Sequence, residues 1–70
     1  MPFVVRIWGY DHKRQGDPRV LCYLNKDGMP VEDRRLAKEY DNEAEAWEHA
    51  RLSGNTGEDE DGPYCWVEEA

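Results

Sequence analysis

Cysteine is scarce in this 70-residue chain, and long apolar runs are missing from it. Cys22 and Cys65 are its two cysteines; each lies within a short apolar run, and metal spacing such as C-x-x-C is absent. We therefore expect two buried free thiols, with one disulfide between neighbouring strands as the alternative. The N-terminus lacks the apolar segment of a signal peptide, and no stretch approaches the roughly 18 apolar residues of a membrane span. The sequence thus predicts a cytoplasmic protein with no membrane partner.

Motifs that identify a reaction are also missing. The sequence has no phosphate-binding loop, nucleophile elbow, H-E-x-x-H pattern or Cys–His spacing. His12 falls in a predicted loop and His49 on a mostly polar helix surface, so the two histidines belong to unrelated elements. We therefore predict a protein that is not an enzyme, with no catalytic residue, no cofactor and no metal ion.

Basic residues become rare after residue 40. Residues 41–70 contain ten Asp or Glu and one basic residue, Arg51, whereas residues 1–40 contain eight Lys or Arg and six Asp or Glu. The formal net charge of the chain is −7, and its pI is near 4.6. Such a charge disfavours direct binding to nucleic acid or to an anionic membrane, and it favours a basic protein partner or high solubility.

Alternating β-branched and aromatic residues predict three strands. The first covers residues 3–10 and the second covers residues 19–25, with a polar loop over 11–18 between them. Asp27-Gly28 marks the turn that follows. Residues 64–69 alternate again and predict a last strand, which we place beside the first one.

The segment 42–53 predicts a helix. Asp41 or Asn42 can cap its first turn, Asn42 with Glu45 resembles a capping box, and Gly54 suits the position after its last turn. The stripe that would face a sheet consists of two small residues and one large one: Ala46, Trp47 and Ala50.

Residues 31–40 are ambiguous. Their composition favours a helix, but their apolar residues fit a helical face poorly, so we predict a short edge strand over 35–40 with Leu36 and Tyr40 on one side. The predicted order is then β-β-(β)-α-β in a single domain, 1–70. This is an α+β two-layer domain with an antiparallel sheet of three to four strands and one helix packed on one face.

One helix can cover only one face of this sheet. The aliphatic face should pack against Trp47 and the rest of the helix; it comprises Phe3, Val5, Ile7, Val20, Cys22, Leu24, Cys65 and Val67. The opposite face is rich in Trp, Tyr and Arg, which concentrate binding energy at protein interfaces. Its candidate partner-binding residues are Arg6, Trp8, Tyr10, Tyr23, Tyr64 and Trp66, with Val4, Arg19 and Leu21 beside them. The alternatives are a second small core beneath residues 31–40 or the long loop, a homodimer, a foreign partner, or stacked single-stranded bases.

Four consecutive carboxylates precede the last strand. The calcium-loop pattern of EF-hands, laid on residues 57–68, is met by Asp59, Asp61, Gly62 and Glu68 but fails at Gly57, and a strand follows where an EF-hand has a helix. A specific calcium site is therefore not predicted. The acidic block is either a solvated loop or part of one negative surface with the helix carboxylates. The candidate residues of that surface are Asp41, Glu43, Glu45, Glu48, Glu58, Asp59, Glu60 and Asp61.

The chain as a whole resembles the small acidic proteins of phages and other mobile elements, among which anti-CRISPR proteins are a functional group. The likeness lies in its size and charge, its β-hairpin, the capped helix "YDNEAEAWEHARLSG" and the last strand "YCWVEE". The resemblance implies a bacterial host and a protein that binds and inhibits a basic surface of a larger nucleic-acid-handling complex, in some relatives by imitating DNA charge. The alternative is a small self-associating, homodimeric domain whose acidic residues serve solubility.

Overall fold

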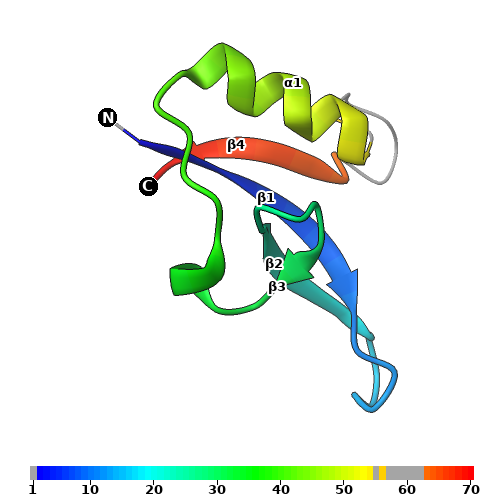
Figure 1. Cartoon of the computed structure of the whole chain (residues 1–70). Coiled ribbons are helices and arrows are strands. Elements are labelled where there is room, and N and C mark those ends of the chain that lie inside the picture. The colour runs from blue at the N-terminus through cyan, green and yellow to red at the C-terminus, as the bar shows by residue number, and fades with distance from the viewer. Residues whose placement is uncertain (1, 55, 57–62) are drawn as a thin grey trace.

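The computed structural model describes residues 2–54, 56 and 63–70, and it contains one helix and four strands in these ranges (Figure 1). The elements are β1 (Phe3–Tyr10), β2 (Arg19–Leu24), β3 (Pro30–Val31), the 3-10 turn η1 (Arg34–Leu36), α1 (Glu43–Ser53) and β4 (Cys65–Glu69). The strands form an antiparallel sheet in the order β3-β2-β1-β4, and α1 packs against it. The predicted α+β fold is confirmed.

Strand β1 lies in the middle of the sheet, between β2 and β4. Ile7 is paired with Cys22 on one side and with Cys65 on the other, and Arg6 is paired in the same way with Tyr23 and Trp66. Because side chains alternate between the faces of a strand, apolar rows and aromatic rows fall on opposite faces of the sheet. The placement of the last strand beside the first is confirmed.

The helix covers the aliphatic face, as predicted. The buried core on this side consists of Val5, Ile7, Cys22, Leu24, Tyr40, Ala46, Ala50 and Cys65, with Phe3, Val20, Trp47 and Val67 partly buried against it. Figure 1 shows α1 lying over β4 and β1. The two alanines are fully buried, so small side chains allow the helix to approach the sheet closely while Trp47 fills the space beside them.

Helix α1 begins at Glu43, one residue after the predicted start at residue 42. The side-chain oxygen of Asn42 accepts hydrogen bonds from the amides of Ala44 and Glu45 at 2.8 and 3.4 Å, so Asn42 and not Asp41 caps the first turn. Gly54 follows the last turn, and its amide donates to the carbonyl of Ala50 at 3.1 Å. Its φ of 174° is extended and not left-handed, so backbone conformation does not explain the glycine at this position.

The lack of room for a Cβ atom explains the glycine at position 54 instead. A Cβ atom built on Gly54 would collide with the ring of Tyr64. We expect the Gly54→Ala variant to lose about 1–3 kcal/mol of unfolding free energy, because the ring or the end of α1 must move. Urea unfolding followed by circular dichroism measures this loss. The Tyr64→Ala change should restore most of it in the double variant, whereas additive losses from the two changes would contradict the collision.

The prediction of an edge strand over residues 35–40 is wrong. The edge strand lies earlier, at Pro30–Val31, where Val31 is paired with Tyr23. Proline is tolerated there because an edge strand does not need every amide for the ladder. The chain then turns at Asp33, whose carboxylate accepts from the Arg35 amide at 2.9 Å and caps the 3-10 turn. Strong local side-chain bonding at Asp33 thus competes with continued strand pairing.

The rest of this segment returns to the sheet at two single bridges. Ala37 is bridged to Asn25, and Tyr40 is bridged to Phe3 with two backbone hydrogen bonds of 2.7 and 2.8 Å. Leu36 is 60% exposed and Tyr40 is 2% exposed, so the two side chains do not share a side as predicted. Three boundaries shift by one residue, since β2 ends at Leu24, β4 begins at Cys65 and α1 begins at Glu43.

Candidate functional site

The face of the sheet opposite α1 is its aromatic side. The register places its side chains in rows across the strands: Tyr23, Arg6 and Trp66 in the first, Leu21 and Trp8 in the second, and Arg19 and Tyr10 in the third. Five of the six predicted partner-binding residues of this face are therefore brought together. We call Arg6, Trp8, Tyr10, Tyr23 and Trp66 the aromatic face.

Tyr64 is the exception, and its assignment to this face is wrong. Its backbone carbonyl accepts from the Trp8 amide at 3.2 Å, but its ring lies against Gly54 at the end of α1. The residue precedes β4, so the alternation that places Trp66 on the aromatic face does not extend to it.

Arg6 is held firmly at the centre of the aromatic face. Its guanidinium carbon lies 4.0 Å from the centroid of the Tyr23 ring, its Nε donates to the carbonyl of Cys22 at 3.2 Å, and it pairs with Glu68 at 3.4 Å. The side chain of Arg6 is only 15% exposed. Guanidinium stacking on a ring combined with a carboxylate fixes the rotamer of this arginine.

The two tryptophans of the aromatic face contact each other edge to face. The ring centroids of Trp8 and Trp66 are 6.3 Å apart with an interplanar angle of 62°. The indole nitrogen of Trp66 donates to Glu68 at 3.0 Å, and the guanidinium carbon of Arg19 lies 5.4 Å from the Trp8 ring. Both indoles are half-buried, so part of each ring remains accessible at this face.

The segment after β3 covers one end of the aromatic face. Arg34 lies 5.7 Å from the Tyr23 ring, and Val4 is only 1% exposed although it is on the side away from α1. The other end differs, because Tyr10 is 61% exposed and the loop 11–18 is exposed throughout. The alternative of a second small core is therefore realised near Tyr23 alone.

Charges around the aromatic face are paired. Arg6 pairs with Glu68, Arg19 with Asp17 at 2.9 Å, and Arg34 with Glu39 at 3.2 Å. Hydrogen bonds from Arg19 lower the pKa of Asp17 to about 2, so this carboxylate stays charged at neutral pH. Each guanidinium at this face thus has a carboxylate beside it.

The helix carries a different kind of surface. Asp41, Glu43, Glu45 and Glu48 are all exposed, and we call these four residues the acidic helix surface. Glu43 accepts from the indole nitrogen of Trp47 at 3.4 Å. Within the part of the chain that the structure describes, none of the four carboxylates forms an ion pair. Their negative charge is therefore uncompensated there.

The acidic block belongs to a different part of the chain. Glu58, Asp59, Glu60 and Asp61 lie outside the described residues, as do Gly57 and Gly62 of the calcium-loop pattern. Glu68, which would close that pattern, binds Arg6 and the Trp66 indole through its two oxygens. The described residues contain no cluster of three or more His, Cys, Asp or Glu suited to a metal ion.

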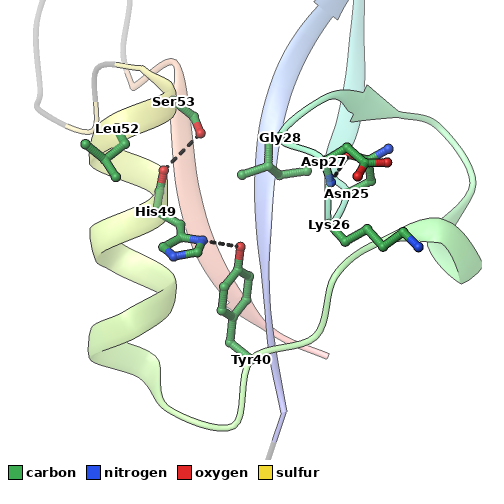
Figure 2. Close-up of a pocket in the computed structure, with 9 residues that line it drawn as sticks. Asn25, Lys26, Asp27, Gly28, Tyr40, His49, Leu52 and Ser53 are labelled. Carbon is green, nitrogen blue, oxygen red and sulfur yellow. Dashed lines mark hydrogen bonds between the residues drawn. The ribbon is translucent and has the colours of Figure 1, made fainter.

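A hollow of about 300 Å³ lies between α1 and the turn after β2, and sequence reasoning missed the pair that borders it (Figure 2). The hydroxyl of Tyr40 and Nδ1 of His49 are 2.9 Å apart, with the rings edge to face, and the Ser53 hydroxyl donates to the His49 carbonyl at 2.9 Å. Burial and the nearby Glu45 raise the pKa of Tyr40. The hydrogen bond between Tyr40 and His49 connects the segment before α1 to the helix and so stabilises the fold.

A second hollow, of about 570 Å³, contains Cys22 and His12 in its lining. Burial, reinforced by Glu32, raises the pKa of the Cys22 thiol, so the thiol is not activated as a nucleophile. Both cysteines are free and buried, as predicted.

Two surfaces remain as candidates for function, the aromatic face on one layer and the acidic helix surface on the other. No helix among the described residues is long and apolar enough to cross a membrane. Comparisons of the chain with protein-family models, curated proteins and solved structures found no match.

Proposed function

We propose that the protein is a non-enzymatic interaction protein whose acidic helix surface binds a basic surface of a larger nucleic-acid-handling complex and inhibits it. The observation that carries the proposal is the unpaired charge of this surface within the described chain. Arg6, Arg19, Arg34 and Arg35 pair with carboxylates elsewhere in the chain. The four helix acids are exposed to solvent and take part in none of these pairs. The class of partner follows the resemblance to small acidic anti-CRISPR-like proteins.

The spacing of the helix acids supports recognition of a cationic groove. Glu45 and Glu48, three residues apart, lie on one side of α1 about 5 Å apart along its axis, whereas Glu43 lies on another side of the helix. One strand of duplex DNA carries roughly one charge per 3.4 Å, so the two charge densities are similar. A partner surface built for phosphates therefore meets a comparable negative field, which steers association and sets its orientation.

The test is a pull-down from bacterial lysate with the wild-type protein and a Glu43→Gln/Glu45→Gln/Glu48→Gln variant, at low and at high salt. We expect a basic partner to be captured at low salt and released at high salt. We expect its affinity for the variant to be lower than for the wild type by a factor of about ten or more. The matched control removes three exposed carboxylates elsewhere: Asp27→Asn/Glu32→Gln/Glu69→Gln. A partner whose binding ignores salt, or withstands the helix substitutions as well as the control ones, would contradict the proposal.

A further inference from the structure

The charged side chains of the aromatic face are paired, on a molecule that is acidic as a whole. Arginines lie at this face, but each has its own carboxylate: Glu68 for Arg6 and Asp17 for Arg19. The helix layer is different, since residues 41–54 contain four carboxylates and one basic residue, Arg51. Two copies of a chain with net charge −7 repel each other, and the repulsion is smaller when they meet at this face than when they meet through their helix layers.

The uncovered end of this face also has the composition of an interface core. Trp8 and Trp66 present half-buried indoles, Leu21 is half-buried beside Trp8, and Tyr10 is 61% exposed. Arg6 is fixed by the Tyr23 ring and by Glu68, so little side-chain entropy remains to be lost on binding. Rigid Trp, Tyr and Arg side chains are the types that carry most binding energy at protein interfaces.

We propose that the occupant of this face is a second copy of the chain, in a two-fold symmetric dimer that directs both acidic helix surfaces outward. A two-fold interface is self-complementary, so each copy must offer both halves of every contact. The Arg6–Glu68 pair supplies a cation and an anion side by side on this face: the Tyr23 ring stacks on the cation, and the Trp66 indole nitrogen donates to the anion. An axis that passes between β1 and β4, midway between the two side chains, sets the guanidinium of one copy opposite the carboxylate of the other.

The area required is modest. A stable interface buries about 800 Å² on each partner. The accessible surface of the chain is 5098 Å², so such an interface would cover about a sixth of it. Single-stranded nucleic acid is a poorer occupant, because stacking on aromatic rings is normally combined with unpaired cations along the strand, and the arginines of this face are paired.

The experiment is sedimentation over a wide range of protein concentration with two face variants and one matched control. Tyr10→Glu adds a charge at the exposed edge of the face, and Trp8→Ala removes its central ring. Met29→Glu places the same charge in the turn after β2, at nearly the same exposure, 60% against 61%. We expect the wild type and Met29→Glu to associate reversibly as dimers, and we expect each face variant to raise the dimer dissociation constant at least tenfold.

Circular dichroism of the same samples identifies a variant that fails to fold, and Tyr10→Glu leaves the core untouched in any case. A wild type that stays monomeric at about millimolar concentration would overturn the proposal and assign the face to another occupant. Growth beyond dimers would overturn the two-fold arrangement. The Glu43→Gln/Glu45→Gln/Glu48→Gln variant should still dimerise. The proposal of a dimer and the proposal of partner binding by the acidic helix surface can therefore be contradicted independently of each other.

Discussion

The Tyr40→Ala variant is expected to lose about 3–5 kcal/mol of unfolding free energy, the range typical of a large aromatic side chain removed from a core. Tyr40 is 2% exposed, packs in the core beneath α1, and lies below Lys38, whose ammonium is 4.8 Å from its ring. A chain of this length has roughly 4–10 kcal/mol of stability in total, so the variant should be largely unfolded on mild heating. Urea or thermal unfolding followed by tryptophan fluorescence measures the loss.

Two matched substitutions separate the ring from its hydroxyl. Tyr40→Phe keeps the ring and removes the hydrogen bond to His49, so it should lose about 1 kcal/mol. Tyr10→Ala removes a ring that is 61% exposed and should change stability by less than about 1 kcal/mol. If Tyr40→Ala were no more harmful than Tyr40→Phe, the ring would not be the link between residue 40 and the core.

The thiols of Cys22 and Cys65 are expected to react with a disulfide reagent about a hundredfold or more slowly than a free cysteine at pH 8. The exposed fractions of these residues are 5% and 0%, and Cys65 donates to the Ala50 carbonyl at 2.9 Å. Burial raises the pKa of both thiols, so both access and thiolate formation require opening of the fold. Reaction rates with and without denaturant measure the protection, and a Cys22→Ala variant reports Cys65 alone. Rapid labelling of folded protein would contradict the burial.

The same burial fixes the sign of the pH dependence. A thiol ordinarily titrates with a pKa near 9.0, and in the folded protein both thiols titrate above it. Between these values the unfolded chain loses protons that the folded chain retains, so stability is complete below about pH 9 and falls as the pH rises. Tyr40, whose pKa is raised above 10.0, adds to the fall at higher pH. The Cys22→Ala variant should therefore show a shallower loss than the wild type.

Local pattern was sufficient to predict most of the fold. The alternation of Val5 and Ile7 with Arg6 and Trp8 determines which face each side chain takes, and Asn42 determines where α1 begins. The aromatic face follows from the same alternation, so the amino-acid sequence alone predicts its main residues. The position of an arginine on a face does not predict which carboxylate it pairs with, however. The ion pairs that neutralise this face depend on side-chain rotamers and on the tertiary packing of the strands and loops.

The segment between β3 and α1 could not be predicted, for physical reasons. Its single bridges at Ala37 and Tyr40 have no periodic sequence signal, and the cap at Asp33 is a local hydrogen bond that competes with the strand pattern. The burial of Tyr40 and its bond to His49 depend on the path of this segment. Tyr64 was misplaced because alternation applies only within a strand, and the strand begins one residue later.

The central position of β1 has a consequence for the order in which the molecule assembles. Its partner on one side is the neighbouring hairpin strand, but its partner on the other side is β4, where Arg6 meets Glu68 across 62 residues of sequence. The loop closure entropy of that distant pairing must be overcome before α1 can pack on Cys65 and Val67. The hairpin can form early and locally, whereas the helix layer, with its acidic surface, becomes fixed only when the last strand docks.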